Sequence, residues 1–337
     1  MKARKEVLSC CLLVLCFSLL AGAAAAQTKP IELSYSVFQP PAHRNAVLVT
    51  EWSREVEKRT NGRVKITLFY GGTLTPPDKC YNGVVNGISD LGTSVFSYTA
   101  GKFPLTEVTD LPLGYKSGEQ AAKLFNEYYK KFQPKEFDEV KMLYLYAISP
   151  GFLMTKSKPV RTLEDLKGMK IRSTGTGAKI VSHLGATAVA MPITDTYDAL
   201  NRGVVDGLLS PYEVLDGFRM ADVVKYVTED YGASYSLSFF VAINKAKWNS
   251  LPADIRQILE KTSEEWIEKT GKAADEIDKL GREVGQKRGV QTIILSKQEN
   301  DRWANAVKPL LDEYVKDKKA KGLPADEALK FFQDRLK

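Results

Sequence analysis

The amino-acid sequence predicts an α/β fold with two lobes, and three features of its pattern support this prediction. Alternating apolar and polar residues predict strands at 31–37, 64–70 and 88–94, with helical periodicity between them. The same order of elements restarts after Lys141. Strands that alternate with helices form a parallel sheet covered by helices. Because no low-complexity linker divides the two units, we expect strands that cross from one lobe to the other.

Local signals set the boundaries of the individual elements. The helix predicted at 44–59 ends before Asn61-Gly62, a pair that favours helix termination. A short helix around Cys80 leads into the third strand. In the second unit, strands are predicted at 142–148, 152–155, 169–172, 187–191 and 204–209, and helices at 163–168, 177–184 and 194–202. A strand at 237–244 is expected to return to the first sheet, followed by a long helix from Pro252 to about Lys287 and a final helical pair divided at 322–324.

The first 26 residues have the three-part pattern of a secretory signal peptide. A short basic head precedes an apolar run at 7–20, and Ala24 and Ala26 place the cleavage before Gln27. An uncleaved anchor is the alternative, but the run is short for a membrane span of about 20 residues. Cleavage would remove three of the four cysteines, so we expect no intramolecular disulfide and a buried, unreactive Cys80.

Charge and missing motifs exclude several classes of function. The chain carries a net charge of +7, of which the first 26 residues contribute two, and the basic residues are interleaved with acids. This pattern is typical of solvated helix faces, so no nucleic-acid partner is expected. His43 and His183 lie outside any metal-binding motif, no G-x-S-x-G elbow is present, and residues 173–179 lack the spacing of a phosphate-binding loop. We expect no catalytic residue, no metal and no cofactor; for His43, both a ligand contact and a packing role remain open.

Arg172 is the strongest candidate for a binding residue. It ends an apolar strand directly before a glycine-rich turn. In open α/β sheets, ligands bind beyond the carboxyl ends of the strands. A guanidinium at that place can hold a carboxylate through two parallel hydrogen bonds, although a surface salt bridge would explain the arginine equally well.

Five segments resemble motifs of one family in the family's order. Residues 163–172 (LEDLKGMKIR) resemble the DLKGxKIR signature of the DctP-like solute receptors of TRAP (tripartite ATP-independent periplasmic) transporters. The other segments are 58–64 (KRTNGRV), 103–112 (FPLTEVTDLP), 197–207 (YDALNRGVVDG) and 243–248 (INKAKW). The resemblance implies a two-lobed periplasmic-binding-protein-like fold of the TRAP type, with the long helix bridging both lobes.

The same resemblance implies a function and a domain plan. A non-enzymatic receptor in the periplasm would bind a small organic acid, with Arg172 on the carboxylate, and deliver it to membrane permease subunits driven by an ion gradient. A ligand sensor of the same fold that docks on a signalling partner is the alternative. After the signal peptide (1–26), lobe I would comprise 27–149 plus about 235–265. Lobe II would comprise 150–234 plus about 266–320, before a C-terminal helix at about 321–337.

Departures from the family pattern suggest an apolar pocket. Leu153 stands near the place of a second arginine in sialate-type members, Val95 replaces an acid, and Ser210 stands where asparagine is frequent. Tyr212-Glu213 resembles a region that helps to hold a metal-bridged oxo acid in some relatives, which leaves a bridging cation open. Beside Arg172, Ser210 and Glu213, the expected wall residues are Phe38, Val95, Tyr98, Leu153, Ile193, Tyr212 and Phe239. We expect a monocarboxylate with a hydrophobic or aromatic body, or a 2-oxo acid.

Overall fold

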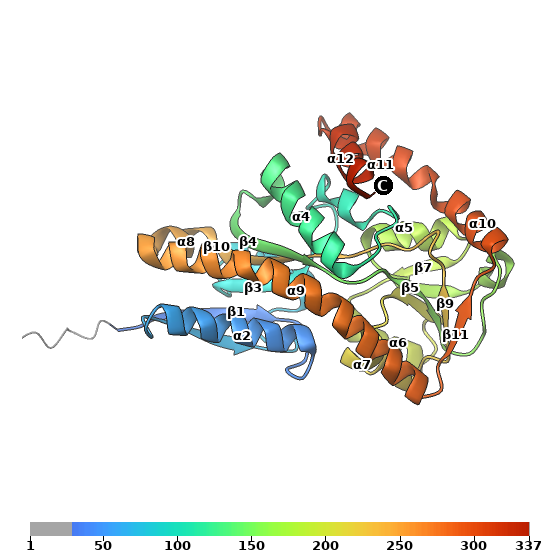
Figure 1. The fold of residues 1–337 in the computed structure, drawn as a ribbon, viewed down its shortest axis with the longest axis horizontal. Helices are drawn as coiled ribbons and strands as arrows, with labels where there is room; N and C mark the ends of the chain where they lie inside the picture. Colours follow the sequence, from blue (N-terminus) through green and yellow to red (C-terminus); the bar gives the residue numbers. More distant parts are fainter. Residues whose placement is uncertain (1–28, 337) are drawn as a thin grey trace, which may run out of the picture.

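Two β-sheets, each covered by helices, form two lobes that lie side by side (Figure 1). The computed structural model describes residues 29–336, so the predicted signal peptide lies outside the described residues. The first sheet has the strand order β2-β1-β3-β10-β4, and the second has the order β11-β9-β5-β8-β6-β7. We call the parts built on these sheets lobe I and lobe II. The predicted two-lobed α/β fold is confirmed.

Lobe I contains the β-α-β-α-β unit expected at the start of the chain. Its strands are β1 (Ile31–Val37), β2 (Val64–Phe69), β3 (Leu91–Val95), β4 (Val140–Ala147) and β10 (Ser238–Asn244), and its helices are α2 (Arg44–Arg59), α3 (Cys80–Val85), α4 (Gly118–Phe132) and α8 (Lys245–Ser250). β1 pairs in parallel with β2 and β3, and β10 lies antiparallel between β3 and β4. Strand β10 thus returns to the first sheet, as predicted, whereas α4 was not anticipated.

The boundaries of α2 illustrate how the sequence determines an element. The His43 side chain accepts a hydrogen bond from the backbone N–H of Asn45 and caps the helix at its start. At its end, Asn61 and Gly62 have φ angles of 52° and 75°. Asparagine and glycine tolerate this left-handed conformation better than other residues, so the helix stops there. Between these ends, Trp52 packs edge-on against Tyr35 of β1 in the core.

Lobe II has a mixed sheet. Its strands are β5 (Phe152–Thr155), β6 (Lys170–Ser173), β7 (Thr187–Ala190), β8 (Gly207–Ser210), β9 (Tyr226–Glu229) and β11 (Gln291–Ile294), and its helices are α5 (Gly175–His183), α6 (Ile193–Asn201), α7 (Val214–Gly217) and α10 (Lys297–Val307). β6 is parallel to β7 and β8, whereas β5 is antiparallel to β8 and β9. The sequence did not predict β9 and β11. Both are four-residue strands, and only one residue of β11 is buried, so neither has a long apolar pattern.

Two segments cross between the lobes and pair with each other. Residues 148–151 lead from β4 to β5, and residues 230–237 lead from β9 back to β10. Gly151 forms an antiparallel bridge with Tyr235, with an N···O distance of 2.8 Å between Gly151 N and Tyr235 O. A Cβ atom at Gly151 would lie 2.6 Å from the Tyr235 ring, so this pairing requires glycine. The lobes are therefore connected by a two-stranded crossing and not by a flexible tether.

Helix α9 (Ala253–Lys287) is the third connection, and its 35 residues span about 50 Å along both lobes (Figure 1). In lobe I, Trp266 donates a hydrogen bond from Nε1 to the Leu48 carbonyl of α2 at 2.9 Å. In lobe II, Gly285 of α9 faces Leu215 of α7, and Gly281 faces the backbone of Tyr212 and Glu213 just before α7. The long bridging helix is confirmed.

The chain ends in three helices, one more than the predicted pair, and the predicted division at 322–324 lies between the last two. Helices α10, α11 (Pro309–Ala320) and α12 (Ala325–Leu336) follow β11. Pro309 starts a new helix because proline lacks the N–H that would continue the preceding one and fits the first helical position. Helix α12 returns to lobe I, where Phe332 packs against Phe125 and Tyr128 of α4.

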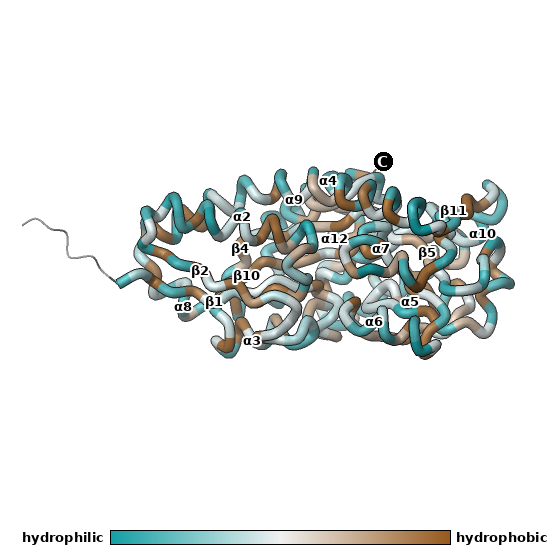
Figure 2. The backbone as a smooth tube through the Cα atoms, turned by 90° about the horizontal axis from the view of Figure 1, so that it is seen from below, coloured by the Kyte–Doolittle hydropathy of each residue, from teal (hydrophilic) through white to brown (hydrophobic). Residues whose placement is uncertain are grey.

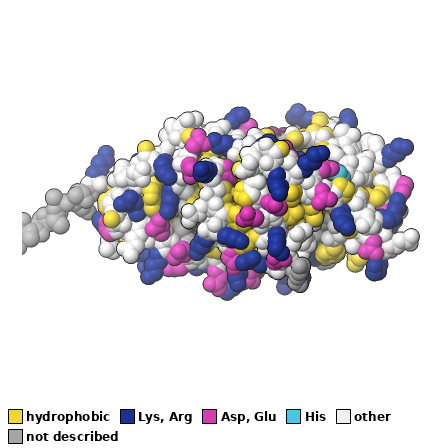
Figure 3. Space-filling model, turned by 90° about the horizontal axis from the view of Figure 1, so that it is seen from above, with side chains coloured by type: hydrophobic (Ala, Val, Ile, Leu, Met, Phe, Trp, Pro, Cys, Tyr) yellow, Lys and Arg dark blue, Asp and Glu magenta, His cyan; other side chains and the backbone are white. Residues whose placement is uncertain are grey.

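The outer surface carries charges of both signs. Polar and apolar residues alternate along the outer helices α2 and α9 (Figure 2), and basic and acidic side chains intermingle on the face shown in Figure 3. Arg59 of α2, for example, pairs with Glu265 of α9 at 2.7 Å. This pair is half-buried and bidentate, and Arg59 also pairs with Glu55, so it supports the contact of α2 with α9 beside their apolar faces.

The contact of α9 with lobe II gives a stability prediction. A Cβ atom at Gly281 would lie 2.1 Å from the Tyr212 carbonyl oxygen, which is backbone and has little freedom to move. Gly281→Ala should lower the free energy of unfolding by about 1–3 kcal/mol, although alanine favours helices more than glycine does. Urea unfolding measures this change, with Lys279→Ala on the exposed side of α9 as the control. An unchanged or higher midpoint for Gly281→Ala would contradict the packing described here.

Candidate functional site

A small cavity between the lobes contains Arg172 and most of the residues predicted around it. Lobe I contributes Phe38, Gln39, His43, Asn45, Val95, Tyr98 and Phe239; lobe II contributes Arg172, Ile193, Ser210, Pro211, Glu213, Val214 and Phe218; and the crossing segments contribute Ile148 and Leu237. The free space is about 20 Å³, enough for roughly one water molecule. The lobes are therefore closed on each other, and an organic acid enters only when they separate.

Eight of the ten predicted site residues line this cavity: Arg172, Ser210, Glu213, Phe38, Val95, Tyr98, Ile193 and Phe239. They come from segments far apart in the chain, mostly from the ends of strands and the turns that follow them. Their contact with a ligand stays a prediction.

Leu153 and Tyr212 do not line the cavity. Leu153 is paired with Leu209, whereas Arg172 is paired with Leu208, and successive strand residues point to opposite faces of a sheet. The Tyr212 ring lies under the Arg282 guanidinium, 3.9 Å from ring centroid to Cζ, and its hydroxyl donates to Glu229 at 2.9 Å. Leu153 was predicted as a wall residue from the place of an arginine in sialate-type relatives, and Tyr212 from the resemblance of Tyr212-Glu213 to a region of other relatives. In this structure both side chains point away from the cavity.

Arg172 is held in place by neutral groups. Its side chain is 1% exposed, its Nε donates to the Met191 carbonyl at 3.0 Å, and its Nη2 lies 3.4 Å from the Tyr98 hydroxyl. Among residues 29–336, no carboxylate pairs with it within 4 Å. The surface salt bridge that the sequence left open is therefore not formed. A buried cation without an anionic partner is costly, so this site favours an incoming anion.

Tyr98 connects the two lobes at Arg172. It belongs to the short 3-10 helix η2 (Phe96–Tyr98) of lobe I, and its hydroxyl accepts hydrogen bonds from Arg172 Nη2 and from the backbone N–H of Ile193, both in lobe II. Because both contacts use lone pairs, the Tyr98 proton is left for another acceptor. The guanidinium and this hydroxyl together provide donors for one anion.

Three phenylalanines form an aromatic wall. Phe38 lies nearly parallel to Phe218 and Phe239, with centroid distances of 6.4 and 6.3 Å, and edge-on to Tyr98 at 6.0 Å. Phe218 was not predicted, because it follows a helix of only four residues and no periodic pattern marks it.

A polar group of residues lies beyond this wall. His43 Nδ1 accepts from Asn45 N at 3.1 Å, so the other ring nitrogen, Nε2, donates to Glu213 Oε2 at 2.8 Å. Gln39 is 1% exposed, and its Nε2 donates to the Tyr146 hydroxyl at 3.2 Å. The sequence left His43 open and missed Gln39, although the position of Gln39 just after strand β1 is a signal for ligand contact.

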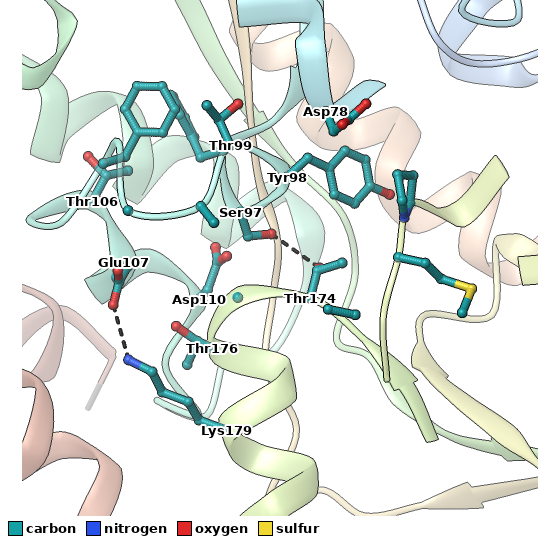
Figure 4. Close-up of a pocket in the computed structure, with 18 residues that line it drawn as sticks. Asp78, Ser97, Tyr98, Thr99, Thr106, Glu107, Asp110, Thr174, Thr176 and Lys179 are labelled. Carbon is teal, nitrogen blue, oxygen red and sulfur yellow. Dashed lines mark hydrogen bonds and ion pairs between the residues drawn. The ribbon is translucent and has the colours of Figure 1, made fainter. Parts of the chain in front are cut away.

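A second, larger cavity of about 410 Å³ also has Tyr98 in its lining (Figure 4). Ser97 and Thr174 meet across the lobes with 3.2 Å between their hydroxyl oxygens, and Lys179 of α5 pairs with Glu107 of lobe I at 3.3 Å. Asp110 lines this cavity, and its Oδ1 accepts hydrogen bonds from the backbone N–H and the hydroxyl of Ser238. Burial raises the pKa of Asp110 to about 7.

Other reactive groups are not arranged for chemistry. Cys80 is buried, and burial raises its pKa to about 12, as expected for an unreactive thiol. In the described part of the chain, no cluster of three or more His, Cys, Asp or Glu side chains is placed to hold a metal ion. Within residues 29–336, no helix is both long and apolar enough to cross a membrane.

The family model for bacterial extracellular solute-binding protein, family 7 (DctP) matches residues 36–318. The chain therefore belongs to this family, as its motifs indicated. Members of the family are solute receptors of TRAP transporters, so this chain is a substrate-binding transport protein and not an enzyme.

Three solved structures of TRAP solute-binding proteins show the same fold. One from Desulfovibrio salexigens, described as an open complex, is 36% identical with a TM-score of 0.78, covering 91% of this chain and 95% of that one. One from a marine metagenome, specific for aromatic acids and bound to metahydroxyphenylacetate, is 28% identical with a TM-score of 0.87, covering 91% and 98%. One from Rhodoferax ferrireducens with copurified benzoate is 26% identical with a TM-score of 0.86, covering 91% and 97%.

Curated relatives bind acids of several kinds. The monocarboxylate 2-oxoacid-binding periplasmic protein of Nostoc is 30% identical over 61% of this chain and 58% of its own length. The C4-dicarboxylate-binding protein DctP of Rhodobacter capsulatus is 26% identical over 87% of this chain and 89% of its own length. Family membership alone therefore does not determine the ligand.

Asp110 gives a pH prediction. Its folded pKa of about 7 exceeds the ordinary value of 3.8. Between these values the folded protein retains a proton that the unfolded chain has lost, so rising pH destabilises the fold through this group until about pH 7. Asp110→Asn stays uncharged and keeps an oxygen acceptor for Ser238. The difference in unfolding free energy between Asp110→Asn and the wild type should therefore shift by about 2 kcal/mol in favour of the variant from pH 5 to pH 8. Urea unfolding at the two pH values measures this shift. An equal difference at both pH values would refute a raised pKa at Asp110.

Proposed function

We propose that this chain is the periplasmic receptor of a TRAP transporter for a small monocarboxylate with an aromatic or similarly apolar body. The observation that carries the proposal is the buried Arg172 guanidinium, which has no anionic partner in the described chain and lies next to an aromatic wall. An acid with one carboxylate and a flat apolar body is complementary to these two features.

The carboxylate would bind where the two lobes meet. Arg172 uses Nε and Nη2 in its present contacts, and a guanidinium has five N–H donors in all. The remaining donors and the Tyr98 proton supply the hydrogen bonds that a desolvated carboxylate requires. Because Tyr98 and Arg172 belong to different lobes, a carboxylate held by both would stabilise the closed form over the open form.

The body of the acid would pack against Phe38, Phe218 and Phe239. Apolar and aromatic walls with a few polar anchors are typical of small-molecule sites. The aromatic acids bound by the marine metagenome and Rhodoferax ferrireducens proteins support this class of ligand. A 2-oxo acid, as bound by the Nostoc relative, is the alternative within the monocarboxylates.

Export and delivery complete the proposal. The signal-peptide pattern in residues 1–26 supports secretion with cleavage before Gln27, and membership of a family of extracellular solute-binding proteins supports a place in the periplasm. The partner would be a pair of TRAP permease subunits in the membrane, which receive the acid from the open form of the receptor.

A thermal-shift screen tests the ligand class. Benzoate, phenylacetate and mandelate are compared with pyruvate, succinate and glucuronate at equal concentrations, because a ligand that binds only the folded state raises Tm with its affinity. The aromatic monocarboxylates should raise Tm the most. Larger shifts with succinate or glucuronate would overturn the proposal.

Arg172→Lys tests the anchor within the same experiment. Lysine keeps the charge but cannot form two parallel hydrogen bonds with one carboxylate, so affinity for the best acid should fall at least about tenfold. Exposed Arg202→Lys is the matched control and should bind as the wild type does. Equal affinity of Arg172→Lys and the control would show that the acid is anchored elsewhere.

A further inference from the structure

The cavity has a second polar end that the binding of a simple acid leaves unused. Gln39 lines the cavity, and its Oε1 is buried with no hydrogen-bond partner among the described residues. A buried amide oxygen without a hydrogen-bond partner is energetically unfavourable. A polar ligand atom that pairs with it would therefore be stabilised in the cavity. Glu213 and His43, paired at 2.8 Å, line the same cavity.

Ring contacts place this end across the aromatic wall from Arg172. Tyr98, which contacts Arg172, packs on Phe38, and Phe38 is flanked by Phe218 and Phe239. The His43 ring lies 5.0 Å from Phe218. On the other flank, Phe239 stacks at 4.6 Å on Tyr146, whose hydroxyl is bonded to Gln39. An acid with its carboxylate on Arg172 and its ring at the wall would therefore extend toward Gln39 and Glu213.

The second end carries negative charge. His43 uses Nδ1 as an acceptor for Asn45 N–H, so the histidine supplies one N–H to Glu213 and the carboxylate keeps acceptor capacity. Asp278 of α9 lies behind Glu213, and burial, followed by the charge of Glu213, raises the Asp278 pKa to about 7. A neutral hydroxyl can donate to the Glu213 carboxylate, whereas a second carboxylate at this place would be repelled by it.

We propose that Gln39, with the Glu213–His43 pair, selects a hydroxyl group on the acid at the end opposite its carboxylate and rejects diacids. This inference rests on the proposed function, because it assumes a monocarboxylate anchored on Arg172. A hydroxyl both donates and accepts, so it pairs with either atom of the Gln39 amide. The ligand class is then a hydroxylated aromatic monocarboxylate.

Isothermal titration calorimetry with a matched set of acids tests the selection. Benzoate, 3-hydroxybenzoate, 4-hydroxybenzoate and isophthalate share one ring and one carboxylate, and they differ in the second substituent. The better hydroxybenzoate should bind at least about tenfold more tightly than benzoate, because its hydroxyl pairs with the buried Gln39 amide. Isophthalate should bind at least about tenfold more weakly than benzoate, because Glu213 repels its second carboxylate.

Two variants assign these preferences to residues. In Gln39→Leu, the affinities for the hydroxybenzoate and for benzoate should differ by no more than about twofold. In Glu213→Gln, the affinity for isophthalate relative to that for benzoate should rise at least about tenfold. Exposed Gln257→Leu and Glu264→Gln are matched controls that should keep the wild-type ratios. If Gln39→Leu does not fold in a thermal melt, Gln39→Met, which is closer in length, replaces it.

The outcomes separate this inference from the proposed function. Failure of benzoate and both hydroxybenzoates to bind the wild type would overturn both. Binding of benzoate with no preference for hydroxybenzoates, or with a preference that Gln39→Leu retains, would overturn the selection by Gln39 alone. Wild-type affinity for isophthalate equal to that for benzoate would overturn the rejection of diacids.

Discussion

The guanidinium of Arg172 imposes the constraint on which the rest of the site depends. It is buried at the junction of the lobes and held by a backbone carbonyl and a tyrosine hydroxyl, neither of which carries charge. Removing a cation from water without an anionic partner costs several kcal/mol. When the lobes open, Arg172 regains water, and when they close around an acid, the ligand supplies the missing charge. The charge balance at this residue thus couples ligand binding to closure.

Three segments connect the lobes and determine how the lobes can move around the ligand. Residues 148–151 and 230–237 pair with each other, so the crossing bends as one unit. Helix α9 lies along both lobes, and its Gly281 contacts the backbone of Tyr212 and Glu213. Because His43 belongs to lobe I and Glu213 to lobe II, a change in the angle between the lobes changes the distance between these two side chains. The cavity is assembled by closure, as hinge motion around a ligand requires.

Site residues were predictable where they lie at or next to the end of a strand with a clear apolar pattern. Val95 ends β3, Arg172 is the penultimate residue of β6, and both line the cavity. Prediction failed where side-chain direction decided the outcome, as for Leu153, because a shift of one residue in a strand reverses the face. Gln39 was missed although it follows strand β1 closely, and Phe218 was missed because it follows a helix of four residues with no periodic pattern. The two-lobed fold was predictable because its strands and helices alternate, whereas short strands such as β9 depend on their neighbours in the sheet.

A crystal structure of the protein with benzoate would show where and how the acid binds. We expect a closed form in which two N–H groups of Arg172 bind the carboxylate, the Tyr98 hydroxyl donates to it, and the ring packs on Phe38, Phe218 and Phe239. Density for benzoate in the larger cavity beside Asp110, with Arg172 still bonded only to Met191 and Tyr98, would contradict this expectation.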